Sequence, residues 1–192
     1  MHRDIRPDNI LPAQEQPVLA DFGIAKLLRD GATHGTLTSA GMSIGTVTYM
    51  APEQMVADPD LDGRVDVYSL AAVGYELLAG RVLFEGSPQQ VMSAHVVKAP
   101  PSLADTAPAT PPFLREVTAR GLAKERADRP TAEQFALLLE DSMRRVAEAA
   151  PESASAGAIG SGSATARRGR QAGGLFLLTL VTRRHVVGVA AR

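Results

Sequence analysis

Residues 2–11 read HRDIRPDNIL, and the interpretation of the whole chain starts from this stretch. It contains the spacing H-R-D-x-x-x-x-N, in which the carboxylate of Asp4 is followed by the amide of Asn9. Two short motifs come later, D-F-G at residues 21–23 and A-P-E at residues 51–53. One tripeptide alone is weak evidence, but three motifs in this order, with Asn9 in register, are hard to obtain by accident.

This ordered set resembles the second half of the protein kinase signature. On these motifs, residues 2 to about 147 are similar to the C-terminal lobe of a bacterial-type Ser/Thr protein kinase. The resemblance implies an α+β, mainly α-helical fold, that is, a protein-kinase-like C-lobe without the N-terminal β-rich lobe. It also implies transfer of the γ-phosphoryl group of ATP to Ser or Thr of a protein substrate, with ATP and Mg²⁺ as cofactors.

The resemblance gives the chemistry to a few residues. Asp4 would accept the proton of the substrate hydroxyl and orient its oxygen, for which a carboxylate suffices because the transition state is loose. Asn9 and Asp21 would hold Mg²⁺ on the nucleotide phosphates as hard oxygen ligands. Thr46 matches the threonine that hydrogen-bonds the catalytic aspartate in Ser/Thr kinases. Leu11 matches the residue under the adenine ring, although it is equally interpreted as plain core.

Arg6 departs from the family pattern, which usually has Lys two residues after the catalytic aspartate to contact the γ-phosphate. Arginine keeps the positive charge but replaces a compact ammonium with a larger planar group. Two alternatives follow: Arg6 takes the role of the lysine adequately, or the change lowers the kinase activity.

Residues 24–50 are rich in Gly, Thr and Ser, as a mobile activation segment would be. Arg3 resembles the arginine that pairs with a phosphate on this segment in switchable kinases. We therefore hypothesise autophosphorylation, with an unmodified loop as the alternative. The candidate acceptors are Thr36, Thr38, Ser39 and Ser43.

Five residues are given structural roles by the same motifs. They are His2, Phe22, Glu53, Asp66 and Arg129. Glu53 and Arg129 match an ion pair that ties the activation segment to the late helices. Residues 65–79 are apolar on nearly every face, which predicts a central helix ending at Gly80. Asp66 lies inside this helix, where a buried carboxylate is costly unless it accepts hydrogen bonds. In the family pattern, the backbone of the catalytic loop donates these hydrogen bonds.

Capping and alternation signals predict the other elements. Residues 87–90 and 131–134 each place a hydroxyl N-cap three residues before Gln. Residues 111–122 combine two prolines with an amphipathic pattern, which predicts a further helix. Residues 9–11 and 18–20 predict a small hairpin.

Composition bounds the remaining possibilities. The 192 residues include no Cys, so disulfides and thiolate zinc sites are excluded, and the few aromatic residues argue against nucleic acid as a partner.

We predict a kinase C-lobe over residues 1–149 and a flexible Ser/Ala/Gly/Arg linker over residues 150–174. Residues 175–192 form a short apolar and basic tail, interpreted as a candidate remnant of a membrane segment. No acidic residue follows Glu152, so this basic end is a candidate contact with a membrane surface.

No signal peptide opens the chain, so we expect a cytoplasmic location.

Two features leave the function open. The sequence contains no G-x-G-x-x-G loop and no V-A-I-K lysine, so we expect residues 1–192 alone to be inactive. We also expect the apolar faces of residues 65–79 to be exposed unless a missing N-lobe or a partner covers them. The alternative function is a non-catalytic half-kinase or pseudokinase interaction module.

Overall fold

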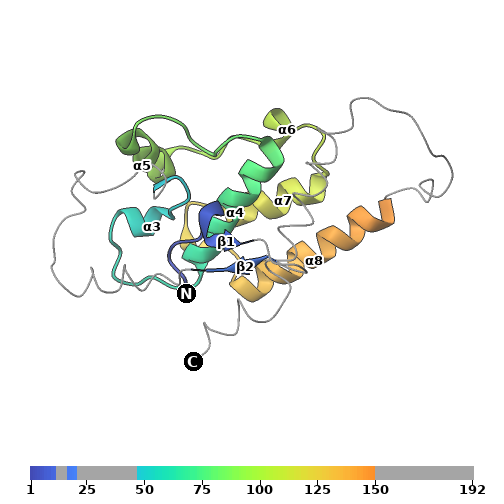
Figure 1. Cartoon of the computed structure of the whole chain (residues 1–192), viewed down its shortest axis with the longest axis horizontal. Coiled ribbons are helices and arrows are strands. Elements are labelled where there is room, and N and C mark those ends of the chain that lie inside the picture. The colour runs from blue at the N-terminus through green and yellow to red at the C-terminus, as the bar shows by residue number, and fades with distance from the viewer. Residues whose placement is uncertain (12–16, 21–46, 150–192) are drawn as a thin grey trace.

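The computed structural model describes residues 1–11, 17–20 and 47–149. Within these ranges the chain is mainly helical, with one two-stranded sheet (Figure 1). The elements are η1 (Pro7–Asn9), β1 (Ile10–Leu11), β2 (Val18–Leu19), α3 (Pro52–Met55), α4 (Arg64–Ala79), α5 (Pro88–Val97), α6 (Leu103–Thr106), α7 (Pro112–Gly121), η2 (Arg126–Asp128) and α8 (Ala132–Ala149).

Helix α4 forms the centre of the core, as its apolar sequence predicts. It packs against α6, α7 and α8 (Figure 1). The helix ends at Gly80, which adopts a left-handed conformation with φ of 72° and donates its N–H to the carbonyl oxygen of Glu76 at 2.7 Å. Glycine suits this position because a Cβ would be strained there.

The expected exposure of the apolar faces of this helix is wrong over most of its length. Every residue from Val65 to Tyr75 is buried except the partly buried Asp66. Leu77, Leu78 and Ala79 are partly buried and pack against the same core. The faces are covered because the helices that follow α4 in sequence fold back onto it, and because Met1 and Ile5 also pack into this cluster.

The capping signals correspond to observed helix starts. At α5, Gln90 N donates to Ser87 Oγ at 3.4 Å and Ser87 N donates to Gln90 Oε1 at 2.8 Å. The same reciprocal pair joins Thr131 and Gln134 before α8, at 3.2 and 2.9 Å. Helix α7 begins at Pro112, as the two prolines predict. These three helix predictions are confirmed.

The predicted hairpin is present as strands β1 and β2, which pair antiparallel with Ile10 opposite Leu19 and Leu11 opposite Val18. The alternation expected of a strand places Ile10 and Leu19 in the core. Leu11 and Val18 are exposed, at 49% and 53%. The hairpin therefore has one buried face and one open apolar face.

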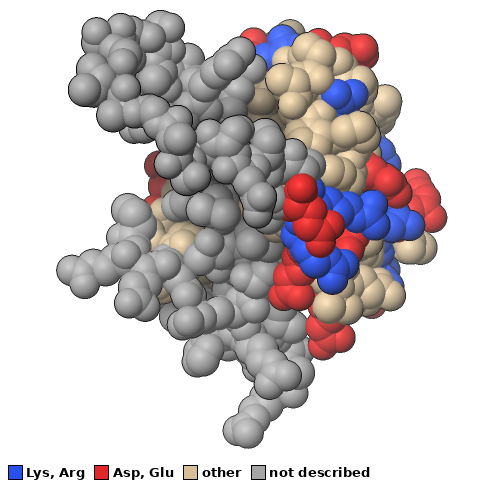
Figure 2. All heavy atoms as spheres, turned by 90° about the vertical axis from the view of Figure 1, so that its right-hand side faces the viewer, with Lys and Arg blue, Asp and Glu red and all other residues tan. Residues whose placement is uncertain are grey.

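A second, smaller core joins the segment before α3 to helix α5. Its buried members are Val47, Met50, Met55 and Val91. On the face shown in Figure 2, basic and acidic side chains are intermixed. No helix in the described ranges is both long and apolar enough to cross a membrane.

Several predicted residues and segments lie outside the described residues. These are Asp21, Phe22, Thr36, Thr38, Ser39, Ser43, Thr46, the linker over residues 150–174 and the tail over residues 175–192.

Candidate active site

The loop that carries Asp4 is fixed to the first turn of α4 by Asp66. The backbone N–H of His2 donates to Asp66 Oδ2 at 2.6 Å, and that of Arg3 donates to Oδ1 at 2.8 Å. Arg3 has a φ of 68°, a left-handed conformation that costs a non-glycine residue roughly 1–2 kcal/mol. The two bonds to one carboxylate hold the loop in this strained shape, and they give the otherwise costly Asp66 its partners.

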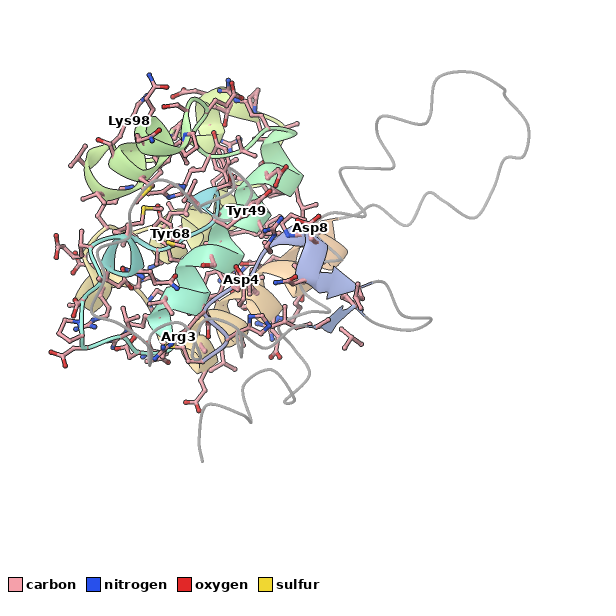
Figure 3. All side chains as sticks on the ribbon, turned by 60° about the vertical axis from the view of Figure 1, so that its left-hand side comes forward. Arg3, Asp4, Asp8, Tyr49, Tyr68 and Lys98 are labelled. Carbon is pink, nitrogen blue, oxygen red and sulfur yellow. The ribbon has the colours of Figure 1, made fainter. Side chains whose placement is uncertain are left out.

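Asp4 and Asn9 lie against each other at the end of this loop. The Asn9 Nδ2 donates to the carbonyl oxygen of Asp4 at 2.7 Å and to Asp4 Oδ2 at 3.1 Å. Asn9 is buried at the end of η1, which Pro7 begins. The amide therefore orients the carboxylate, and its own oxygen Oδ1 takes no part in these two bonds. Asp4 is labelled in Figure 3 together with Arg3 and Asp8, its neighbours along the loop.

Arg6 forms an ion pair with Asp8 two residues away. Its Nε donates to Asp8 Oδ2 at 2.8 Å, and Nη2 contacts the same oxygen. The Asp8 side chain is largely exposed, so the pair contributes at most about 1 kcal/mol and leaves Arg6 able to exchange partners. Leu11 is half-exposed on β1, so its alternative interpretation as a core residue is wrong.

His2 connects the loop to the end of β2. Its Nδ1 accepts the N–H of Asp4 at 3.3 Å, which requires the proton to be on Nε2. Nε2 lies 3.0 Å from the carbonyl oxygen of Ala20, which can only accept. His2 thus joins the Asp4 loop to the residue that directly precedes Asp21.

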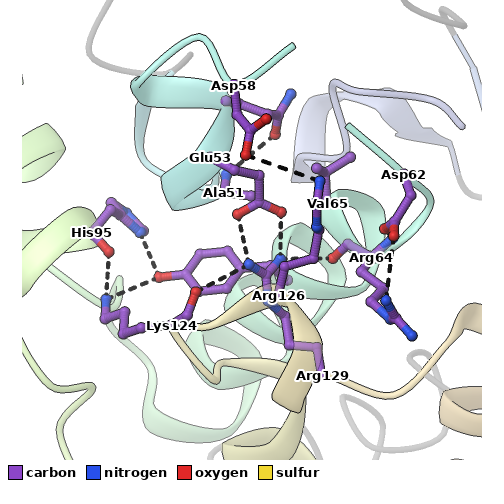
Figure 4. Close-up of polar contacts among 12 residues, drawn as sticks. Ala51, Glu53, Asp58, Asp62, Arg64, Val65, His95, Lys124, Arg126 and Arg129 are labelled. Carbon is purple, nitrogen blue, oxygen red and sulfur yellow. Dashed lines mark hydrogen bonds and ion pairs between the residues drawn. The ribbon is translucent and has the colours of Figure 1, made fainter. Parts of the chain in front are cut away.

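The ion pair expected between Glu53 and Arg129 is present and buried (Figure 4). Arg129 Nη1 donates to Glu53 Oε1 at 2.7 Å, and Nη2 donates to Oε2 at 2.6 Å. Arg129 is 2% exposed and also donates to the carbonyl oxygens of Arg64 and Lys124. Its guanidinium carbon lies 5.3 Å from the ring centroid of Tyr68. This one side chain therefore ties α3, α4 and the turn before α8 together.

Gln54 is a bridging residue that the sequence analysis missed. Its Nε2 donates to the carbonyl oxygen of Arg3 at 3.0 Å, and its Oε1 accepts the N–H of Ala51 at 3.2 Å. Gln54 therefore connects the A-P-E segment to the Asp4 loop. The available signal was a Gln at the third position of a helix that starts with Pro52, but Ala51 has no capping hydroxyl and so hides half of the capping-box pattern.

Tyr49 is a second residue that the motifs did not single out. Its hydroxyl donates to Glu76 Oε2 at 2.6 Å, which gives the polar Glu76 of α4 its partner (Tyr49 is labelled in Figure 3). Burial, the hydrogen bond to Glu76 and the charge of Glu76 raise the pKa of Tyr49 above its usual value. The hydroxyl therefore stays a donor, and the segment before α3 is tied to the central helix.

The described residues contain no cluster of three His, Cys, Asp or Glu side chains suited to a metal ion. Magnesium needs fewer protein ligands when it binds with a nucleotide, because phosphate oxygens and water fill most of its coordination shell. Of the two expected magnesium ligands, Asn9 lies on this loop, where its amide oxygen is a hard ligand of the right kind, and Asp21 lies outside the described residues. The chemistry of these two side chains fits a magnesium ion bound with a nucleotide.

Comparison with known proteins decides the family. The family model described as "Protein kinase domain" matches residues 1–137. The chain belongs to the protein kinase family. Among curated relatives of this kinase chain, the Ser/Thr protein kinase PknF of Mycobacterium tuberculosis is 43% identical over 135 residues, which cover 67% of this chain and 27% of PknF.

Two more relatives give the same result. Ser/Thr protein kinase Pkn1 of Myxococcus xanthus is 40% identical over 136 residues, which cover 67% of this chain and 19% of Pkn1. Ser/Thr protein kinase PknE of M. tuberculosis is 40% identical over 129 residues, 67% of this chain and 22% of PknE. The kinase chain thus spans about a quarter or less of these relatives. The prediction of a bacterial-type Ser/Thr kinase, present as a partial chain, is confirmed.

Proposed function

We propose that this chain is the C-terminal lobe of a Ser/Thr protein kinase. It contributes the residues that transfer the γ-phosphoryl group of ATP to a Ser or Thr hydroxyl of a protein. The observation that carries the proposal is the contact between Asp4 and Asn9 on a loop held to α4 by Asp66. Phosphoryl transfer depends mainly on positioned groups, and this arrangement positions a carboxylate and an amide.

In this proposal Asp4 accepts the hydrogen bond of the incoming hydroxyl and later its proton. Asn9 and Asp21 bind magnesium, which neutralises charge on the phosphates when it is bound with ATP. Arg6 exchanges Asp8 for the γ-phosphate, a change that its exposed ion pair permits. Thr46 orients Asp4.

The proposal also holds that residues 1–192 are inactive without the N-terminal lobe. The sequence contains neither the glycine-rich loop nor the strand lysine that cover the nucleotide in this family. Transfer from [γ-³²P]ATP to a Ser/Thr peptide library should therefore be at background level with the isolated chain. ATP-dependent labelling by this chain alone would overturn that part.

A chimaera tests the catalytic roles. A kinase N-terminal lobe that carries the glycine-rich loop and the lysine is fused upstream of residue 1, and labelling of the peptide library is measured. We expect labelling on Ser and Thr, reduced about 10²- to 10⁴-fold by Asp4→Asn, because the positioned acceptor is lost. Asp8→Asn is the matched control, since Asp8 is exposed and its ion pair is weak; it should retain most of the activity.

The alternative function is a non-catalytic interaction module, favoured by the same lack of nucleotide-covering elements in these residues. If the chimaera folds cooperatively but shows no labelling, or if Asp4→Asn leaves labelling unchanged, this alternative replaces the catalytic proposal.

Three further expectations remain proposals. One is autophosphorylation on Thr36, Thr38, Ser39 or Ser43, which would place a phosphate that pairs with Arg3. Phosphopeptide mapping of an active form tests it. A cytoplasmic location, with the basic tail after Glu152 on an anionic membrane surface, is tested by sedimentation with anionic vesicles. The partner expected over exposed core would contact exposed apolar side chains such as Leu11 and Val18 on the open face of the hairpin, since most of α4 is buried.

A further inference from the structure

His95 occupies a fully buried position that no motif of the sequence analysis includes. It lies on α5 with 0% of its surface exposed, 5.7 Å from the ring of Tyr68 and 5.0 Å from that of Phe84, centroid to centroid. Both of its nitrogens have partners. Nδ1 lies 2.9 Å from the Tyr68 hydroxyl, and Nε2 lies 2.9 Å from the carbonyl oxygen of Thr48.

These partners allow only one tautomer. A carbonyl oxygen can only accept, so Nε2 carries the proton that bonds to Thr48. Neutral imidazole has one N–H, so Nδ1 must accept from the Tyr68 hydroxyl. That hydroxyl in turn accepts from Lys124 Nζ at 3.4 Å. The hydrogen bonds thus run in one direction, from Lys124 through Tyr68 and His95 to Thr48.

Lys124 fixes the other side of His95. Its Nζ donates to the carbonyl oxygen of His95 at 2.6 Å (Figure 4). It also donates to the carbonyl oxygen of Ala94 at 3.3 Å, and both acceptors lie in the last turn of α5. A cation at this end of a helix is favourable because the terminal carbonyls carry partial negative charge. The ammonium also lies 4.9 Å from the ring centroid of Phe84. Burial, and to a smaller extent the neighbouring cation, opposes protonation of His95, whose pKa falls to about 4.

The segment that His95 contacts combines apolar packing with hydrogen bonds to two helices. Val47 and Met50 pack against Met55 and Val91, and unbranched methionines adapt to many positions. Within this segment the one backbone bond among the described residues joins Met50 N to the carbonyl oxygen of Val47 at 3.3 Å. Apolar packing is not directional, so it holds the segment near α5 without selecting one orientation. The hydrogen bond from the His95 ring to Thr48 is directional and joins the segment to α5, as the bond from Tyr49 to Glu76 joins it to α4.

We propose that His95 is a positioning residue for the active site, which fixes segment 47–50 through its Nε2–H bond to the carbonyl oxygen of Thr48. Segment 47–50 directly follows Thr46, the residue proposed to orient Asp4, and it contains Tyr49, which bonds to Glu76 of α4. The proposal rests on the proposed function for its consequence in catalysis. The positioning itself is tested without any assay of activity.

The first test is the protonation of the ring in the 192-residue chain, measured by ¹⁵N NMR of the imidazole nitrogens. The His95 signals are assigned by their loss in His95→Gln. We expect the Nε2–H tautomer with an unprotonated Nδ1 throughout the range from pH 8 to pH 6. An Nδ1–H tautomer, or titration near pH 6.5, would overturn the proposal.

The second test compares two amide replacements of the ring. In His95→Gln the side-chain amide reaches the place of Nε2 and can donate to Thr48, whereas in His95→Asn it reaches only the place of Nδ1. Both variants lose the ring, so both lose packing. Amide hydrogen exchange is measured by mass spectrometry for a peptide covering residues 46–56 and for one covering α7 as the internal reference.

The expected result is exchange in residues 46–56 about tenfold faster in His95→Asn than in His95→Gln, with equal exchange in α7. Equal acceleration in both variants would mean that the ring only fills space, and the proposal would be wrong. If His95→Asn does not fold, His95→Met is compared with His95→Gln instead, because methionine is close to glutamine in size and shape but cannot donate a hydrogen bond to Thr48. Faster exchange in residues 46–56 in His95→Met than in His95→Gln then supports the proposal, and equal exchange contradicts it. None of these outcomes depends on whether the chain transfers phosphate.

Discussion

At the residue scale, three buried or partly buried charges are stabilised in three ways. Asp66 accepts two backbone N–H groups, Glu53 pairs with Arg129, and Lys124 donates to carbonyl oxygens at the end of α5. A charge in the interior is costly unless such partners are present. Each of these side chains connects segments that are distant in the sequence, so loss of one partner affects more than one element.

Arg129→Met should lower the free energy of unfolding by about 3–5 kcal/mol, because it leaves the carboxylate of Glu53 buried without a counter-ion. Urea unfolding followed by far-ultraviolet circular dichroism measures the change. Arg145→Met is the matched control, since Arg145 pairs with Asp141 on the exposed face of α8 and should change stability by less than about 1 kcal/mol. Equal effects of the two substitutions would contradict the assignment.

Gln54→Ala should cost roughly 1–3 kcal/mol, because the carbonyl oxygen of Arg3 and the N–H of Ala51 both lose a buried partner. The same urea titration measures it. Gln89→Ala, on an exposed position of α5, should be close to neutral. A near-neutral Gln54→Ala would mean that water replaces the bridge.

At the element scale, the close approach of α7 to α4 depends on a residue without a side chain. A Cβ on Gly121 would lie 2.6 Å from the Cβ of Ala71 on α4 and 3.0 Å from the ring of Phe135 on α8. Ala71 and Phe135 are both about 1% exposed, so neither can move aside without disturbing the core. Gly121 thus lets three helices meet.

Gly121→Ala should therefore destabilise the fold by roughly 1–3 kcal/mol through overpacking. Thermal unfolding compared with Gly63→Ala provides the check. Gly63 has an ordinary φ of −60° and no atom within 4 Å of an added Cβ, so its replacement should be neutral or slightly stabilising. A neutral Gly121→Ala would show that α7 can shift away from α4 at little cost.

At the scale of the whole molecule, the His95 network makes stability depend on pH. The folded-state pKa of His95 is about 4, below the ordinary value of 6.5, because of burial and the nearby charge of Lys124. The unfolded chain therefore binds more protons between these values, and this contribution to stability, fully present above pH 6.5, is lost as the pH falls toward 4.

The difference in unfolding free energy between the wild type and His95→Gln should decrease by up to about 3 kcal/mol from pH 7 to pH 4. Taking the difference removes the carboxylates, which titrate in both proteins. Urea titrations at half-unit pH intervals supply the values. A difference that stays constant with pH would mean that His95 titrates normally in the folded state.

The sequence determined the elements whose signals are local. Reciprocal caps fixed the starts of α5 and α8, and uniform apolarity identified α4 as the central helix. The residues of the Asp4 loop were found from their motif, because their chemistry requires fixed residue types at fixed spacing. The short helices α3 and α6 were missed, since four residues carry too little periodic signal.

Only the tertiary structure decided which groups meet across long sequence separations. It placed Gln54 on the Asp4 loop, His95 beside Thr48, and Gly121 against Ala71, and it covered the faces of α4 that the sequence led us to expect exposed. Burial and hydrogen-bond direction arise from the packing of distant segments, whereas caps and periodicity depend on neighbours in the chain. The sequence could therefore name the family and single out the Asp4 loop, but not the contacts that hold this loop and segment 47–50 in place.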